Sequence, residues 1–264
     1  MSKVGAATVL IAIVAALIGP AVARVDPAVQ DLARRLDGPS ATHWFGLDEL
    51  GRDIFARVLA GARISLLVGI VVVSISSAVG TLLGSIAGYF GGLVDETISR
   101  IIDILLAFPG LLLAIALVAV LGPSLTNVVV ALSLIGWVGY ARLVRGQVLR
   151  AREFEFVQAA RALGAATPRI LAQHVIPTAL PAVTVQATLG MGGAILAEAA
   201  LSFFGLGTQP PDASWGRMLS EGRNYFRQSL WMGVFPGLAI MLVVMGFNFL
   251  GDGLRDALDP RLNR

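Results

Sequence analysis

The sequence contains no cysteine and few charged residues, and each shortage excludes a class of protein. Without cysteine the chain forms no disulfide and no thiolate metal site. Only 14% of its 264 residues are charged, whereas a soluble domain carries roughly a quarter, so the chain is too apolar for water. Lysine occurs only at Lys3, which excludes a P-loop because that nucleotide-binding motif needs a lysine after its glycines.

Residues able to catalyse a reaction or hold a metal are also scarce. The two histidines, His43 and His174, lie far apart and outside the apolar runs, so neither is placed to act as the base of an intramembrane hydrolase. The net charge of +3 is small, and the arginines form no stripe that would bind nucleic acid. We therefore expect no catalytic residue, no metal and no cofactor in this chain, and no nucleic-acid partner.

Hydrophobic residues are abundant, at 56% of the chain with a mean hydropathy of +0.79. A membrane-spanning helix needs about 20 apolar residues, and Gly122-Pro123 divides one run that is too long for a single helix. A glycine-rich turn, Gly88 to Gly92, ends another run. The sequence predicts an all-α membrane protein with six transmembrane helices, at residues 4–23, 64–94, two within 104–141, one from 175 onward, and one at 229–251.

Six spans place both termini on one side of a cell membrane. The arginines divide almost evenly between the sides, but their densest group, Arg142 to Arg169, favours the cytoplasm for that segment. We expect both termini in the cytoplasm, and residues 24–63 and 205–228 outside. The first run has an alternative, a cleaved signal peptide, since Lys3 precedes it and Ala21 to Ala23 resembles a cleavage site. Its length favours an uncleaved anchor.

The polar segment before the second run holds several candidate site residues. Residues 54–63 have helical apolar spacing with Arg57 and Arg63 off the apolar stripe, which predicts a helix lying on the membrane surface. Asp48 is expected to cap this helix or a short turn before it. With Glu49 and Asp53 it offers carboxylates for a cation, but the spacing matches no calcium loop, so we interpret them as solvated caps.

Small residues and tryptophans indicate how the spans pack. Glycine at 80, 84 and 88 forms one helix face that lets another helix approach closely. Trp215 and Trp231 bracket the last outer loop, as interfacial anchors do.

Two carboxylates fall in or near spans. Asp103 lies near the inner end of the third span and Glu198 near the outer end of the fifth. A secondary transporter or ion channel would need acids near the middle of the bilayer to bind coupling ions. Both residues lie within reach of an interface, so we expect them to pack or to contact a partner.

A polar insert, "FVQAARALGAATPRILAQHVIP", separates two apolar runs. Residues 150–163 are predicted to be helical, Gly164 stops the helix, and Thr167 with Pro168 starts a second helix that ends at Pro177 and Pro181. The result is a cytoplasmic hairpin that either docks on a partner or packs on its own bundle. One face is expected to carry Phe156, Ala159, Ala160 and Leu163, and the other Glu155, Gln158 and Arg161.

"QAARALG" followed by Ile176-Pro177 resembles the EAA motif of bacterial ABC-importer permeases. In that family the loop docks on an ATP-hydrolysing subunit. Ala159, Ala160 and Gly164 match the motif, whereas Gln158 stands where the family has glutamate. The resemblance implies an ATPase-coupling site made of Phe156, Gln158, Ala159, Ala160, Arg161 and Gly164.

Three further stretches resemble the dipeptide, oligopeptide and nickel permeases, most closely their C-type subunit: "GLDELGRDIFARVLAGARISL", "AEAALSFFGLGTQPPDASWGRMLSEGRNY" and "FPGLAIMLVVMGFNFLGDGLRDALDPRL". The resemblance implies a type I importer permease, with a five-helix core and an N-terminal span, that moves peptides, although nickel chelates and other small solutes stay open. It also implies a B-type permease partner, two ABC ATPases that hold ATP and Mg, and an extracytoplasmic binding protein.

These inferences divide the chain into four parts. Residues 1–24 form the N-terminal span, and 25–63 an extracytoplasmic segment. Residues 64–253 form the transmembrane domain, with the coupling hairpin at 150–177, and 254–264 a cytoplasmic tail.

Overall fold

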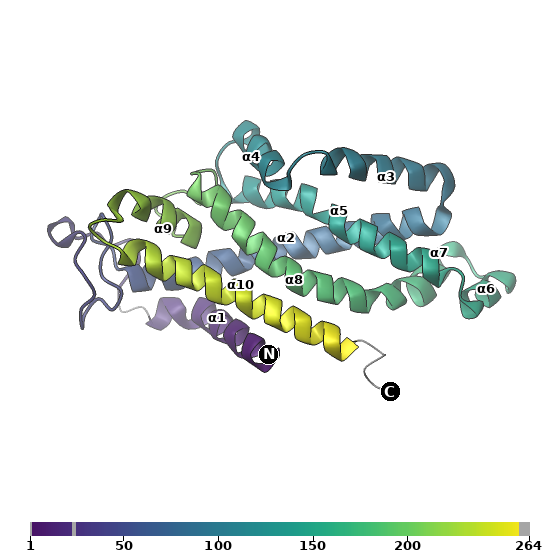
Figure 1. Ribbon diagram of the computed structural model, residues 1–264, viewed down its shortest axis with the longest axis horizontal. Coiled ribbons are helices and arrows are strands. Elements are labelled where there is room, and N and C mark those ends of the chain that lie inside the picture. The colour runs from purple at the N-terminus through teal and green to yellow at the C-terminus, as the bar shows by residue number, and fades with distance from the viewer. Residues whose placement is uncertain (1, 23–24, 259–264) are drawn as a thin grey trace.

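The computed structural model describes residues 2–22 and 25–258, and within them every named element is helical (Figure 1). The single extended pairing in that part of the chain is the bridge between Leu47 and Asp53. The α-helices are α1 (Ser2–Val22), α2 (Ile54–Phe90), α3 (Gly92–Leu106), α4 (Gly110–Leu121), α5 (Leu125–Ala151), α6 (Glu155–Ala162), α7 (Thr167–Ile170), α8 (Ile176–Phe203), α9 (Trp215–Gly222) and α10 (Trp231–Leu258). Arg24 and residues 259–264 of the expected tail lie outside the described residues.

Five stretches are long and apolar enough to cross a membrane: α1, α2, α5, α10 and the continuous stretch Thr167–Phe203. The six expected spans are confirmed when α3 and α4, bent by 85° against each other, count as one broken span. The break at Gly122-Pro123 is confirmed. A second break, before Gly110, was not predicted. It falls at Pro109, whose missing N–H and fixed φ end a helix.

The second span begins earlier than predicted. Residues 54–63 are not a separate surface helix but the first turns of α2, which runs for 37 residues. Asp53 caps it, because its side chain accepts the Ala56 N–H at 2.8 Å. Asp48 instead caps the preceding turn and accepts the N–H groups of Leu50 and Arg52.

The glycine face of α2 packs on α5, as predicted. A β-carbon at Gly84 would collide with the backbone of Ala141, and one at Gly88 would meet Val148. The predicted turn after this face is shorter than expected, since α2 continues to Phe90 and only Gly91 and Gly92 take left-handed backbone angles.

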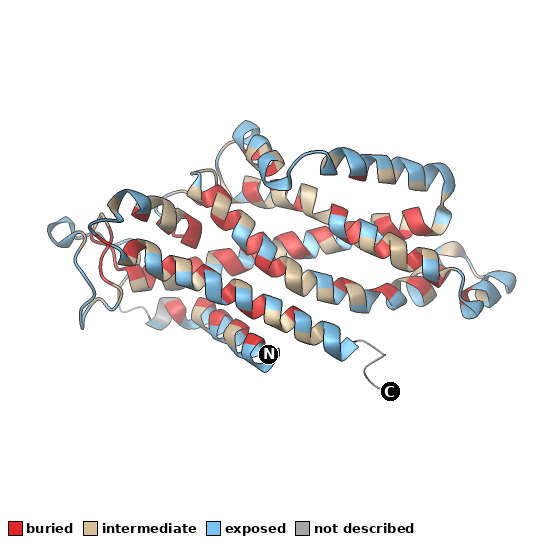
Figure 2. Cartoon of the chain, viewed as in Figure 1, coloured by how far each residue is buried: buried red, intermediate tan, exposed pale blue. Residues whose placement is uncertain are grey.

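The first and last helices lie side by side, so the two described ends of the chain lie close together (Figure 1). Gly253 of α10 is in contact with Ser2, and Gly5 of α1 faces the backbone of Leu250. Buried residues concentrate along the centres of α2, α5 and α8, whereas α3 and the hairpin around α6 are mostly exposed (Figure 2). Many exposed residues of α3 and α4 are apolar. An apolar surface of this kind is expected to face lipid or another subunit.

Candidate functional site

The predicted hairpin lies at the end of the long axis beyond the two termini (Figure 1). Its first helix is shorter than the predicted 150–163, because α5 continues to Ala151 and α6 starts at Glu155. Gly164 stops α6 as predicted, with a φ of +79°. The N–H of Gly164 donates to Arg161 O at 3.0 Å and that of Ala165 to Ala160 O at 3.1 Å. This pair of bonds is a Schellman motif, which explains the glycine.

The second arm of the hairpin differs from the prediction. Thr167 is the first helical residue of α7 and not its cap, which is Ala166 without a side-chain bond. The arm does not end at Pro177 either. A π-helical turn, Leu171–Val175, joins α7 to α8, and Pro177 and Pro181 are both accommodated inside α8. The hairpin is therefore a direct extension of α8 with no loop between them.

The structure divides the predicted apolar face of the hairpin into an inner and an outer set. Ala160 packs towards the core beside Val157, which is fully buried and was missed because its neighbours in sequence are polar or exposed. Phe156 and Ala159 are exposed, and Leu163 is 88% exposed. An apolar side chain that projects this far contributes nothing to its own fold, so the outer set suits a partner.

Polar contacts fix the base of the hairpin to the end of α2. The guanidinium of Arg161 lies 5.2 Å from the centre of the Tyr89 ring, and Arg152 donates to Gly88 O at 3.2 Å. The Gln158 amide donates to Glu153 O at 3.2 Å. A shallow groove of about 520 Å³ beside α6 is lined by Tyr89, Arg152, Glu153, Gln158 and Arg161. Gln158 and Arg161 thus stabilise the conformation of the hairpin, although both are also exposed on its surface.

Two ion pairs hold α3 against α5. Arg145 donates to Asp95 at 2.7 Å, and Arg142 donates to Asp103 at 3.1 Å. Asp103 thus makes the packing contact that the sequence predicted for it, at an exposed position.

Charged residues gather at the opposite end of the molecule, where the segment before α2 meets α9. Arg57 is only 1% exposed and donates to Glu221 at 2.8 Å. Arg52 donates to Asp48 at 2.6 Å and to Glu49 at 2.7 Å. The prediction of solvated caps is half wrong: Asp48 does cap a turn, but it is buried, and its Oδ2 accepts from Arg52 while Oδ1 accepts the backbone N–H groups. One oxygen of Glu49 likewise accepts from Arg52.

Glu49 is the perturbed acid of this cluster, and the neighbouring cap Asp53 has a second role. Burial, with Asp48 as the next cause, raises the pKa of Glu49. Asp53, which caps α2, also forms a 2.8 Å bond with His43 Nδ1. Asp48, Glu49 and Glu221 lie close enough to share a cation, but the arginines already neutralise them.

Trp215 and Glu198 were both expected at a membrane interface. Both are buried instead, because each contacts α2. Trp215 is buried and donates its indole N–H to Val58 O at 2.9 Å, so it is not an interfacial anchor. Glu198 is 0% exposed and cannot reach an interface. Its carboxylate accepts from Ser202 at 2.6 Å and from Ser65 at 3.4 Å, so it has the packing role that the sequence predicted.

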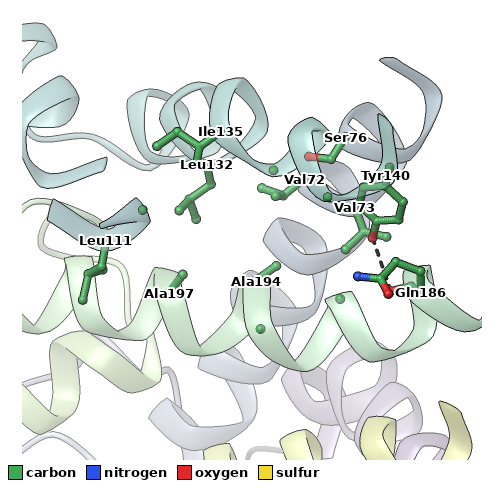
Figure 3. A pocket seen from close by; sticks show the side chains of 15 residues that line it. Val72, Val73, Ser76, Leu111, Leu132, Ile135, Tyr140, Gln186, Ala194 and Ala197 are labelled. Carbon is green, nitrogen blue, oxygen red and sulfur yellow. Dashed lines mark hydrogen bonds between the residues drawn. The ribbon is translucent and has the colours of Figure 1, made fainter. Parts of the chain in front are cut away.

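A cavity of about 280 Å³ lies between α2, α4, α5 and α8 (Figure 3). Its walls are mostly apolar, with three polar side chains from three helices: Ser76, Tyr140 and Gln186. Tyr140 donates to the backbone carbonyl of Gln186 at 3.5 Å. No sequence motif marks this cavity, because four segments far apart in the chain form it.

The chain matches a known family and several curated proteins. Residues 80–264 match the family described as binding-protein-dependent transport system inner membrane component. The dipeptide transport system permease protein DppC of Alkalihalophilus pseudofirmus is 51% identical, over 95% of this chain and 82% of its own. The probable D,D-dipeptide transport system permease protein DdpC of Escherichia coli is 46% identical, over 99% and 88%. The glutathione transport system permease protein GsiD of Pectobacterium atrosepticum is 48% identical, over 88% and 77%.

Solved structures show the same fold. A chain of the MetNI methionine ABC transporter, in an inward-facing conformation, superimposes with a TM-score of 0.57 at 21% identity. The match covers 76% of this chain and 95% of that one. The expected type I importer fold is thereby confirmed.

Proposed function

The chain belongs to the family of binding-protein-dependent transport system inner membrane components, and from this we propose that it imports small peptides, driven by ATPases on separate subunits. As a member of this family it is a multi-pass permease subunit of the inner membrane. The relatives that support a peptide substrate are 46% to 51% identical over nearly the whole chain, and their names specify dipeptides, D,D-dipeptides and glutathione. A dipeptide is the substrate common to most of these names.

The partners follow from the same family. We propose one B-type permease that completes the pathway, two ABC ATPases that bind ATP and Mg, and a binding protein that delivers peptide on the outer side. The single lysine of this chain, Lys3, supports placing nucleotide hydrolysis on the partners, since a P-loop needs a lysine in its motif.

The observation that carries the coupling role is the exposed outer set of the hairpin. Phe156, Ala159 and Leu163 face away from the bundle, while Ala160 and Gly164 shape the hairpin that presents them. Because α7 continues into α8, force applied to the hairpin acts directly on a membrane-spanning helix. We propose that the ATPase binds this outer set, and that Gln158 and Arg161 hold the hairpin in place.

Leu163→Asp tests this proposal. The side chain is 88% exposed, so the fold should survive, whereas a carboxylate in an apolar contact should weaken ATPase binding by about tenfold or more, as loss of an interface hot spot does. The measurement is ATP-dependent uptake of labelled dialanine by the complete complex, together with the amount of ATPase that copurifies.

Leu32→Asp is the matched control. Leu32 is 62% exposed and lies in the polar segment before α2, outside both the hairpin and the spans. It should leave both uptake and ATPase retention close to those of the unaltered protein. Normal uptake with Leu163→Asp would refute the coupling role, and failure of the unaltered complex to take up dialanine would refute the proposed substrate class.

A further inference from the structure

His43 lies in the polar segment before α2, where its ring joins two parts of the chain. Its Nδ1 lies 2.8 Å from an oxygen of Asp53, and its Nε2 lies 3.3 Å from Nη1 of Arg34. Asp53 caps the second span, and Arg34 is the last residue of the short 3-10 helical turn Leu32–Arg34. The ring therefore ties this turn to the start of a membrane-spanning helix.

The two partners of the ring determine where its hydrogen lies. A guanidinium only donates hydrogen bonds, so Nε2 must accept the bond from Arg34 and carries no hydrogen. The hydrogen of the neutral ring is then on Nδ1, which donates it to Asp53. The observed contacts thus require a neutral histidine. The side chain of His43 is 16% exposed, which leaves it within reach of protons from solvent.

Protonation of the ring would keep one contact and break the other. With hydrogen on both nitrogens, Nδ1 still donates to Asp53 but Nε2 can no longer accept from Arg34, and two positive charges then face each other. Asp37 lies 3.2 Å from Nε of Arg34 and offers the guanidinium another partner. Within the described part of the chain, Asp53, Arg34 and Asp37 are the charged groups at bonding distance from the ring or from that guanidinium.

The backbone next to this turn is strained. Leu36 has a φ of +64°, in the left-handed region that a leucine rarely adopts. Its N–H donates to Asp48 O at 2.9 Å, and its side chain packs against the buried core. Such a conformation persists only while the surrounding structure imposes it. The bond between Arg34 and His43, two residues from the strained position, is one of these restraints.

We propose that His43 is a proton-sensitive latch, which holds residues 32–35 against the start of α2 when neutral and releases them when protonated. Histidine ordinarily changes charge between about pH 5 and 8, so the latch opens as the pH falls through that range. This segment is expected outside the cell, where the latch would respond to external acidity. Gln30, just before the turn, lines a groove of about 400 Å³ with Pro211 and Arg217, so release of the turn alters the surface at this end of the molecule.

The mobility of the turn at two pH values tests the latch. Because the chain has no cysteine, Leu32→Cys can carry a nitroxide spin label on the turn, at a position that is 62% exposed. The full chain is placed in lipid nanodiscs, where both membrane faces meet the buffer, so the result does not depend on orientation. Asp212→Cys, exposed in the loop before α9, is the matched control position.

We expect the mobile fraction of the label at Leu32→Cys to rise at least about twofold between about pH 7.5 and 5.5, because histidine titrates within that interval. The label at Asp212→Cys should not respond. Adding His43→Asn to Leu32→Cys should abolish the response, since asparagine can still donate to Asp53 but does not titrate. A response that survives His43→Asn, or no response at Leu32→Cys itself, would overturn the proposal.

Arg34→Ala, combined with the same label, separates loss of the latch from a general effect of acid. It removes the donor to His43, so the turn should be as mobile at the higher pH as the unaltered turn is at the lower. Arg35→Ala is its control, because the neighbouring arginine is also exposed, and it should keep the unaltered response. Equal mobility of the two variants at the higher pH would contradict the role of the bond between Arg34 and His43. None of these measurements involves transport, so their outcome is independent of the proposed function.

Discussion

Arg57 is the largest charged side chain that the fold buries completely. Its guanidinium bonds Glu221 of α9 and lies 3.4 Å from Asp48, so it joins α2 and the turn before it to α9, which is distant in the sequence. A buried charge is tolerated only when its partners remain in place. The outer end of the molecule therefore depends on this one residue more than on any surface ion pair.

Removing this charge should show that dependence. Arg57→Ala removes a charge-assisted hydrogen bond to Glu221, which keeps Arg52 and Arg217 as partners, so the cost should be about 1.5 to 3 kcal/mol. Arg63→Ala, at an exposed position on the same helix, should change stability by less than about 0.5 kcal/mol. Thermal unfolding of the two purified variants in detergent compares them. A similar melting temperature for both would show that the cluster does not stabilise the fold.

Single residues could be predicted where local geometry decides their role. Gly164 was predicted correctly because a helix stop with a left-handed backbone depends on a few neighbouring residues. Arg57, Trp215 and Glu198 were predicted to lie at a surface or interface, and all three are buried. Each is covered by a segment distant in sequence, and hydropathy along the chain carries no information about that covering.

At the scale of elements, the spans were predicted well from the long apolar runs. The breaks between helices were predicted less well. Gly122-Pro123 was recognised as a break because two helix-breaking residues adjoin there. Pro109 was missed inside an apolar run, and Pro177 was wrongly taken as the end of a helix. A proline breaks a helix only if no neighbouring turn absorbs it, and the π-helical turn before Pro177 does so.

The packing of α2 on α5 gives the clearest test at this scale. Gly84→Ala would force a methyl group against the backbone of Ala141, and such overpacking costs about 1 to 3 kcal/mol. Gly146→Ala on α5 makes the same chemical change in open space and should stabilise its helix by up to about 1 kcal/mol. Thermal unfolding should therefore move in opposite directions for the two variants. A shift in the same direction would contradict the close contact.

At the scale of the whole molecule, α8 connects the hairpin to the cavity between the spanning helices. Its N-terminal end continues into the hairpin through the π-helical turn, and its central residues, Gly190 to Ala197, form one wall of the cavity. A rigid shift of α8 driven at the hairpin would therefore change the cavity's shape. The candidate coupling residues were identified from a short motif, whereas the cavity required the arrangement of four helices.

The orientation of this arrangement in the membrane is open to direct measurement. The terminal ends of α1 and α10 both point towards the hairpin, so one labelling experiment orients the whole molecule (Figure 1). Because the chain has no cysteine, single cysteines can be introduced at Ala166 in the hairpin turn and at Asp212 in the loop before α9. Both positions are exposed, whereas the nearby Ser214 is buried and would react poorly.

We expect a membrane-impermeant thiol reagent to label Asp212→Cys on intact cells, and Ala166→Cys only after the membrane is opened. The reason is the arginine density from Arg142 to Arg169, which the positive-inside rule places in the cytoplasm. The hairpin must also lie there if it is to meet subunits that use cytoplasmic ATP. Labelling of Ala166→Cys but not Asp212→Cys on intact cells would reverse the orientation, and no ATPase could then reach Leu163.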